Sequence, residues 1–285
     1  MAYESSVPYR AGAEGYTSFR IPAVVRARSG HLLASPRAGV SSAADSGTIH
    51  IVLKRSADAG RTWGPLQVVA RNGNGNGNGN GNGNGNGNGN GNGNGNGNGN
   101  GNGNGTAGNP APVVLDSGRV LLLQVHNAAD ATEDRIRRGR VPPADGRRVW
   151  LQHSDDDGAS WSPPREITDQ AKLLQWRWYA TGPGHALQLR HGPYAGRLLV
   201  PANHSTPPTD PQDSGTEPRY NGGHALLSDD ECATWRTAHT VGGLPAAYSD
   251  LVRLDRHSVG LLYETGDFSA YSTITFRRIP VEEPT

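Results

Sequence analysis

The sequence predicts an all-β protein assembled from repeated strand-turn units. The first observation is an octet with the pattern S-x-D-x-G-x-[ST]-W, which begins at Ser56 and returns in full at Ser154. A third copy begins at Ser228 and carries Cys232 where the other two have Gly. Each copy follows a short run of alternating apolar residues, and no long amphipathic helix pattern occurs. The repetition favours sheets that cover one another, most simply a propeller of four-stranded blades.

We interpret the octets as turns that hold hairpins together. An Asp in a tight turn can accept hydrogen bonds from the backbone N–H groups that follow it, and a Gly can adopt the positive φ that closes the turn. The Trp is then expected to pack the end of the hairpin against its neighbour. Calcium or ligand binding by these acidic turns is the less favoured alternative, so the octets indicate fold and not chemistry.

The first predicted elements lead directly into the first octet. Residues Tyr16–Arg28 read as a strand, Ser29-Gly30 as a hairpin turn, and 31–35 as the returning strand. Residues 36–47 form a polar loop of small residues, and 48–54 form the strand before the octet.

Residues 72–105 are an uninterrupted alternation of Asn and Gly. The tract has no apolar side chain to bury, so nothing offsets the entropy lost on ordering it, and we expect a disordered insert or an artefact of the source sequence. A linker between two domains is the alternative. Strands of the same kind resume at 112–115 and 119–125, which favours a single domain formed by 1–71 and 106–285.

The rest of the chain continues the pattern of short strands. A charged segment at 130–147 is expected to be a loop with at most one helical turn. Further strands are predicted at 149–152, 186–189, 196–201, 224–227, 250–254, 260–264 and 272–277.

Composition excludes several classes of function. The 285 residues carry a net charge of +1, which gives no strong field toward nucleic acid or an anionic membrane. A single Cys and ten His without close pairing give no disulfide framework, no metal motif and no cofactor site. No signal-peptide core or membrane-spanning run is visible, so we expect a soluble, cytoplasmic protein of unknown oligomeric state.

Four residues outside the octets are candidates for chemistry. Arg20 lies on the first strand in Phe-Arg-Ile-Pro, and Asp45 lies in the loop of small residues. Tyr248 precedes a late strand, and Glu264 ends the next one. Each alone has an ordinary structural interpretation: a strand-edge Arg, a loop Asp, a core Tyr and a solvated Glu.

Taken together with the octets, these residues resemble the exo-α-sialidases (neuraminidases) of the bacterial and mammalian cytosolic kind. The resemblance implies a six-bladed β-propeller with its site at the centre. The resemblance covers nearly all of the non-repetitive chain. The three octets correspond to the aspartate boxes, or BNR repeats, of that family. The other matching motifs are Tyr16–Pro22, Gly108–Pro112, Trp178–Gly184, Tyr248–Leu251 and Leu262–Glu264.

The resemblance implies a role for each candidate. Arg20 is one of three arginines that hold the carboxylate of sialic acid, a group that a planar guanidinium can bind with two parallel hydrogen bonds. Tyr248 is the nucleophile, since a carboxylate would be repelled by the substrate's own carboxylate, and sialidases are known for a Tyr nucleophile. Asp45 is the general acid and base, and Glu264 orients the first arginine.

The same resemblance places Asn109, Trp178 and Tyr179 around the sugar pocket. The implied partner is a sialylated glycan, hydrolysed at its terminal sialic acid with retention of configuration. No metal, nucleic acid or membrane is implied.

The chain departs from the family pattern in one long segment. Only twelve residues separate Trp235 from Tyr248, where the family has a much longer stretch that carries the second and third arginines and the Glu that deprotonates the tyrosine. We therefore expect an incomplete propeller that lacks one to two blades. The order of side chains in Ser35–Gly39 also differs from the family's pocket wall.

Two functional hypotheses follow. The chain is an exo-sialidase, or it is a catalytically impaired or inactive relative, either a sialoglycan-binding propeller or the product of a decayed gene.

Overall fold

The computed structural model describes residues 4–72, 105–207, 220–224 and 244–280. Within these residues the regular structure is almost entirely β-strand, which confirms the all-β prediction. The third octet and the end of the strand predicted at 224–227 lie outside the described residues.

The first sheet contains the strands around the first octet. It runs in the order β2 (Ser18–Arg26), β3 (Leu32–Gly39), β4 (Ile49–Ser56) and β5 (Gln67–Arg71), with each neighbouring pair antiparallel. The predicted strands are all present, and β3 continues to Gly39. Residues 36–39 therefore belong to a strand, whereas the sequence had placed them in the polar loop.

The second sheet repeats this plan after the Asn-Gly tract. Its order is β6 (Gly105–Val114), β7 (Val120–Ala128), β8 (Arg148–Ser154) and β9 (Arg165–Glu166), again antiparallel throughout. One parallel pair between Ile49 and Thr106 connects it to the first sheet.

The third sheet is shorter. It consists of β10 (Tyr179–Thr181), β13 (Ala202–Ser205) and β14 (Tyr220–His224). A small hairpin of β11 (Leu187–Gln188) and β12 (Leu198–Leu199) lies between them in the chain, so the strand expected at 196–201 is replaced by two shorter ones.

The fourth sheet joins the two ends of the described chain. Its order is β15 (Ala246–Arg253), β16 (Ser258–Thr265), β17 (Thr273–Pro280) and β1 (Ser5–Arg10). The sequence analysis did not predict β1, which pairs antiparallel with β17 and completes the sheet. Because β1 adds the N-terminal strand to the C-terminal hairpins, this sheet is complete only when both ends of the described chain are paired.

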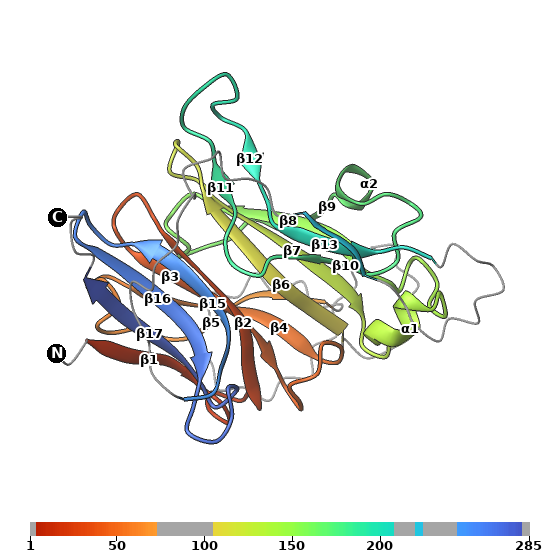
Figure 1. The fold of residues 1–285 in the computed structure, drawn as a ribbon, viewed down its shortest axis with the longest axis horizontal. Helices are drawn as coiled ribbons and strands as arrows, with labels where there is room; N and C mark the ends of the chain where they lie inside the picture. The colour runs from red at the N-terminus through yellow and green to blue at the C-terminus, as the bar shows by residue number, and fades with distance from the viewer. Residues whose placement is uncertain (1–3, 73–104, 208–219, 225–243, 281–285) are drawn as a thin grey trace, which may run out of the picture.

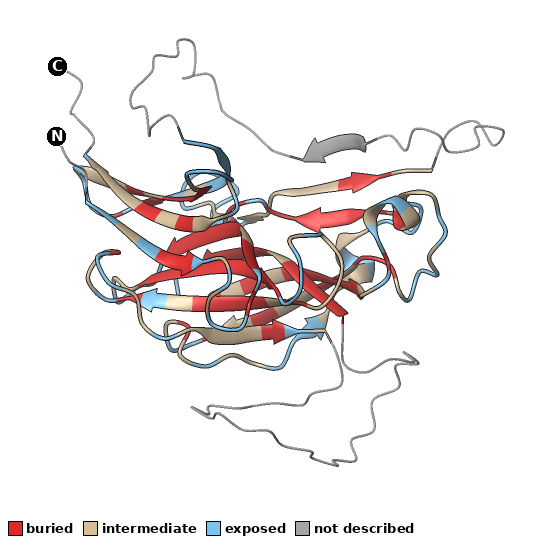
Figure 2. Ribbon diagram, turned by 90° about the horizontal axis from the view of Figure 1, so that it is seen from below, coloured by how far each residue is buried: buried red, intermediate tan, exposed pale blue. Residues whose placement is uncertain are grey.

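The four sheets follow one another in the order four, one, two, three around the molecule (Figure 1). Hydrophobic clusters fill the space between each neighbouring pair: Phe19, Val24 and Phe276 between sheets four and one, and Leu33 and Val120 between one and two. Figure 2 shows that the buried residues lie along the middles of the strands and the exposed ones at the connecting loops. The burial of each sheet face therefore depends on its neighbour.

The two described octets, which begin at Ser56 and Ser154, are turns, as predicted. In the first, Asp58 Oδ1 accepts from the Thr62 backbone N–H at 2.9 Å, and Ser56 Oγ accepts from the Gly60 N–H at 2.8 Å. The hydrogen bonds from Thr62 lower the pKa of Asp58 to about 2. Trp63 then packs edge-on against Phe276 of the preceding sheet, with ring centroids 5.5 Å apart.

The second octet repeats the same bonds. Asp156 Oδ1 accepts from the Ser160 N–H, and Ser154 Oγ accepts from the Gly158 N–H, both at 2.8 Å. Trp161 packs on the cluster that contains Leu33 of the preceding sheet. Each Trp thus fixes its own hairpin to the sheet before it.

Two short helices interrupt the strands. Helix α1 (Glu133–Arg137) lies in the charged segment where one helical turn was expected, and α2 (Thr168–Ala171) follows β9. In the described part of the chain, no helix has the length and apolar character that crossing a membrane requires.

Replacing Gly60 of the first octet is predicted to destabilise the fold. Gly60 has φ of 86°, and a Cβ there would lie 2.2 Å from the Phe276 ring. Gly60→Ala should therefore lower the free energy of unfolding by about 1–2 kcal/mol for the left-handed backbone plus about 1–3 kcal/mol for overpacking. Denaturant unfolding measures the loss. Gly12→Ala is the control, because Gly12 has φ of 79° with nothing within 4 Å of its Cβ position; equal losses in the two variants would contradict the packing argument.

The ends of the Asn-Gly tract lie side by side. Asn72 donates from Nδ2 to the Asn127 carbonyl at 2.7 Å, and Gly105 pairs with Ala128 in the second sheet. Excising 73–104 and joining these ends through a few residues should leave the melting temperature unchanged or higher, because the tract has no apolar side chain to bury and a shorter loop costs less closure entropy, about 0.6 kcal/mol for each halving. A marked fall in the melting temperature would show that the tract contributes packing.

Candidate functional site

Arg20 is held at a bulge in β2. The pairing of β2 with β3 shifts register between Arg20 and Ala23, and Ile21 has φ of 52°, which is unusual for a β-branched residue. The Arg20 side chain is 12% exposed, and its guanidinium lies 4.3 Å from the Tyr271 ring centroid and 5.8 Å from that of Tyr248. The bulge thus presents one buried cation between two aromatic rings.

Glu264 connects three strands at this bulge. Its buried carboxylate accepts from the Ile21 N–H at 2.6 Å and from the Tyr248 N–H at 3.3 Å. The Arg20 Nε lies 3.9 Å from Oε1, and burial raises the pKa of Glu264. Glu264 therefore fixes both the backbone that carries Arg20 and the backbone that carries Tyr248.

The Asp45 loop is held by a second arginine, Arg37. Its Nη1 donates to the Ala44 carbonyl at 2.6 Å, while Nη2 donates to the Ala43 carbonyl at 2.9 Å and to Asp45 Oδ1 at 2.8 Å. Burial lowers the pKa of Arg37 to about 10, so it stays cationic at neutral pH. The sequence analysis missed Arg37 as a site residue because it ended the strand at residue 35; continuing the alternation would have turned this side chain toward the site.

A third arginine, Arg147, was also missed. It precedes β8 and is buried, with Nη1 donating to Asn109 Oδ1 and Nη2 to the Asp45 carbonyl, each at 3.3 Å. Its guanidinium lies 3.7 Å from the centroid of Trp178. Burial lowers the pKa of Arg147 to about 9. Nothing in the local sequence separates it from the other basic residues of the charged segment.

These residues form a positively charged group, the arginine cluster, made of Arg20, Arg37 and Arg147. Its guanidiniums lie near two carboxylates, Asp45 and Glu264, while the nearby Glu133 is paired with Arg137. Asp45 and Tyr248 are 44% and 41% exposed, so both reach solvent. Lys172 adds a further positive charge next to Arg147, so positive charge is in excess beside two groups that reach solvent, an arrangement suited to an anionic ligand.

The structure brings together four of the predicted residues and places three others behind them. Asn109 has φ of 55° at a register shift of β6, and its carbonyl accepts from Thr181 Oγ1 at 2.6 Å. Trp178 is 5% exposed beneath Arg147, and Tyr179 is 7% exposed in a cluster with Val149.

No base for the Tyr248 hydroxyl is found among the described residues. Glu264, the carboxylate nearest in the fold, hydrogen-bonds the backbone of Tyr248. A tyrosine hydroxyl ordinarily ionises near pH 10, so its use as a nucleophile at neutral pH requires such a base. The described residues also contain no group of three or more His, Cys, Asp or Glu suited to a metal ion.

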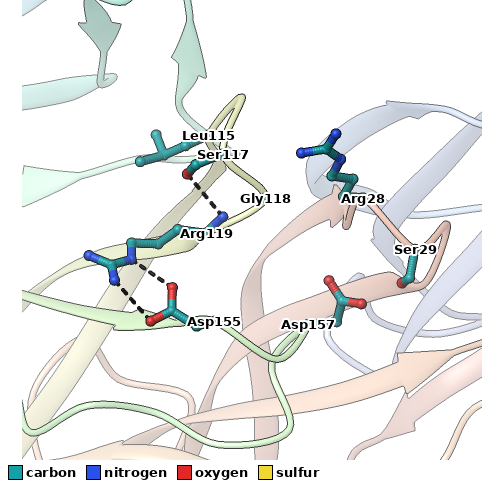
Figure 3. A pocket seen from close by; sticks show the side chains of 8 residues that line it. All are labelled: Arg28, Ser29, Leu115, Ser117, Gly118, Arg119, Asp155 and Asp157. Atoms are coloured by element: carbon teal, nitrogen blue, oxygen red, sulfur yellow. Dashed lines mark hydrogen bonds and ion pairs between the residues drawn. The ribbon is translucent and has the colours of Figure 1, made fainter.

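A hollow lies beyond the end of β2. It has a volume of about 810 Å³ and is formed by the hairpin turns and the second octet (Figure 3). Its Arg119 and Asp155 neutralise each other through bonds of 2.7 and 2.9 Å, and Arg28 donates to the Asp116 carbonyl. We place the candidate site at the arginine cluster, where positive charge is buried and in excess, rather than at this open surface.

An imidazole joins the third sheet to the fourth near the site. His185 Nδ1 lies 2.9 and 3.0 Å from the Asp250 oxygens, and Asp250 Oδ2 accepts from the Val24 N–H at 2.8 Å. The hydrogen bond to Asp250 raises the pKa of His185.

The His185 contact should stabilise the protein in a pH-dependent way. Since the folded-state pKa lies above the unfolded value of about 6.5, its contribution is fully present below that pH and is lost as pH rises through the folded-state pKa. His185→Gln should therefore cost about 1 kcal/mol at pH 6, and less at pH 9, in denaturant unfolding. Burial lowers the pKa of His50 to about 4 and that of His126 to about 3, but these two residues affect the parent and the His185→Gln variant equally. If the difference in unfolding free energy between the parent and His185→Gln grew with pH, the raised pKa of His185 would be contradicted.

Comparisons with known proteins agree on one family. A family model described as a BNR repeat-like domain matches residues 96–261, more than half of the chain. An exo-alpha-sialidase of Aspergillus fumigatus is 32% identical over 203 residues, covering 66% of this chain and 42% of the fungal protein. A sialidase of Micromonospora viridifaciens is 27% identical and covers 81% of this chain and 30% of its own length. The chain thus spans less than half the length of these relatives.

Solved structures show the same fold. The leech intramolecular trans-sialidase, complexed with 2,7-anhydro-Neu5Ac, aligns with a TM-score of 0.61 at 13% identity, over 98% of this chain and 70% of the leech chain. The Trypanosoma rangeli sialidase, in complex with 2,3-difluorosialic acid, aligns with a TM-score of 0.56 at 14% identity, over 98% of this chain and 59% of the other.

Proposed function

Since the chain belongs to the sialidase family with BNR repeats, we propose that its arginine cluster binds terminal sialic acid on glycoconjugates and that the chain hydrolyses it slowly. The observation that carries the proposal is the surplus positive charge of Arg20, Arg37 and Arg147 beside the exposed Asp45 and Tyr248. Sialic acid has one carboxylate on its anomeric carbon, which a cluster with surplus positive charge can accept.

The carboxylate would be held by Arg20. Its buried Nε has no hydrogen-bond partner among the described residues, and Glu264 holds the backbone of the next residue, Ile21, and that of Tyr248. A planar guanidinium in such a fixed position can offer two parallel N–H groups to a carboxylate. Arg37 lies next to it and holds Asp45 rather than competing for the same face.

The hydrolysis we propose has two steps with retention. In the first, the Tyr248 oxygen bonds to the anomeric carbon as the glycosidic bond breaks, and Asp45 gives its proton to the leaving oxygen. In the second, Asp45 takes a proton from water, whose oxygen replaces that of Tyr248 on the same carbon. The hydroxyl proton of Tyr248 passes to solvent water in the first step, because in the described residues no carboxylate accepts it, and the phenolate that leaves in the second step takes a proton back from solvent.

This missing acceptor favours low turnover. General-base assistance contributes about 10²- to 10⁴-fold to a rate, so its loss would leave an enzyme that binds its substrate better than it converts it. The second hypothesis is a sialoglycan-binding propeller or decayed gene product, in which the same missing acceptor reduces turnover to zero. The short spacing between Trp235 and Tyr248 supports both slow turnover and no turnover.

The test is release of fluorophore from an aryl sialoside by the purified protein. We expect turnover at least 10²-fold below the typical enzyme value of about 10 s⁻¹, abolished in Tyr248→Phe and in Asp45→Ala. Binding of sialic acid, measured by titration calorimetry, should be retained in Tyr248→Phe and weakened at least tenfold in Arg20→Lys, because Lys cannot offer two parallel donors.

Arg26→Lys is the matched control, since Arg26 is on the same strand with an exposed side chain. Ordinary turnover that Tyr248→Phe abolishes would refute the impaired-site proposal and show that other residues complete the site. Absence of both binding and turnover would refute a sialic acid site altogether.

A further inference from the structure

We propose that Arg147 is a positioning residue that holds the Asp45 loop, Asn109 and Trp178 in one arrangement. The inference rests on the function proposed above, because it is there that Asp45 acts as the acid. Asp45, Asn109 and Trp178, three of the residues expected at the site from sequence, each contact the Arg147 guanidinium.

The geometry needs a guanidinium. Nη1 donates to Asn109 Oδ1 and Nη2 to the Asp45 carbonyl, in two different directions, while the flat face lies 3.7 Å from the Trp178 centroid. The ammonium group of a lysine is a compact charge, so it cannot donate in two fixed directions and also stack flat on an aromatic ring. Only an arginine can therefore make the three contacts at once.

The three contacts come from different sheets. The Asp45 loop leaves the first sheet after β3, Asn109 is in β6 of the second, and Trp178 directly precedes β10 of the third. Asn109 in turn accepts from Thr181 of β10 through its carbonyl. Arg147 therefore connects the Asp45 loop to β6 and to the segment that leads into β10, and does not act on one loop alone.

Stability alone does not account for a cation at this position. Arg147 is 1% exposed, and the structure gives its guanidinium no direct bond to a carboxylate. The Lys172 ammonium lies nearby and donates to the Arg147 carbonyl at 3.0 Å, which adds repulsion. A buried charge without a bonded counter-ion is costly, and a packed apolar side chain would generally be no less stable. A cation at this position is accounted for if the position of the Asp45 loop matters for function.

The Asp45 loop is bound through its carbonyl oxygens. Those of Ala43 and Ala44 accept from Arg37, that of Ala43 also accepts from Arg20, and that of Asp45 accepts from Arg147. The Asp45 side chain itself is 44% exposed. Arg147 thus acts on the backbone of Asp45, whereas the Asp45 carboxylate is bound at Oδ1 by Arg37 and still reaches solvent.

Three variants separate this role from general stability. Arg147→Lys keeps the positive charge but loses the planar set of N–H donors. Arg147→Met keeps the volume of the side chain but loses both the charge and the donors. Arg148→Lys is the matched control, because Arg148 is the next residue in the chain and pairs instead with Glu166 at the outer edge of the second sheet. Thermal unfolding identifies any variant that fails to fold, and the conclusions are drawn from those that do.

The first measurement is hydrogen exchange of the peptide covering residues 41–47. We expect faster exchange in Arg147→Lys than in the parent, and parent-like exchange in Arg148→Lys. The second is kcat/KM for a sialic acid linked to a sugar hydroxyl, compared with one linked to an activated phenol. A poor leaving group depends on acid assistance and a good one does not, so Arg147→Lys should lose about tenfold more on the sugar-linked substrate.

The outcomes are distinct. Faster loop exchange together with the unequal loss supports the proposal. Unchanged loop exchange in Arg147→Lys, or equal losses on both substrates, overturns it. If the parent turns over neither substrate, the proposed function has failed, and loop exchange alone decides whether Arg147 positions the loop.

Discussion

The site depends on buried guanidiniums that satisfy the carbonyl groups of one loop. Arg20, Arg37 and Arg147 together donate to the carbonyls of residues 43, 44 and 45. A loop of small residues has almost no side chains with which to fix itself, and carbonyls turned inward need donors. The same cations that would attract an anionic ligand thus define where the acid residue lies, so binding and positioning share one set of charges.

Those charges can be buried only because the sheets around them are rigid. Tryptophans of the two described octets pack on the preceding sheet, and Glu264 and Asp250 bind backbone N–H groups of β2 from the fourth sheet. Carboxylates used in this way join strands that are far apart in the sequence. The cost is that Glu264 already has both oxygens engaged, which leaves it unsuited to take a proton from Tyr248.

The balance between recognition and turnover follows from this arrangement. In the proposed function, recognition of a carboxylate requires only fixed donors, which Arg20 and its neighbours would supply. Turnover requires in addition an acceptor for the tyrosine proton, and the short segment before Tyr248 contains no Asp or Glu. Under this proposal, binding of the ligand therefore depends on fewer residues than its conversion does.

The sequence by itself determined the all-β architecture and the turns of the first two octets, because these depend on local patterns: alternation and a turn signature. It predicted Arg20, Asp45, Tyr248 and Glu264 as site residues from short motifs, and the structure places these four near one another. It did not reveal β1, whose strand character depends on pairing with β17 at the other end of the chain. Nor did it reveal Arg37 and Arg147. One basic residue looks like another in a sequence, and only the packing of three sheets decides which guanidiniums are removed from water and turned toward the Asp45 loop.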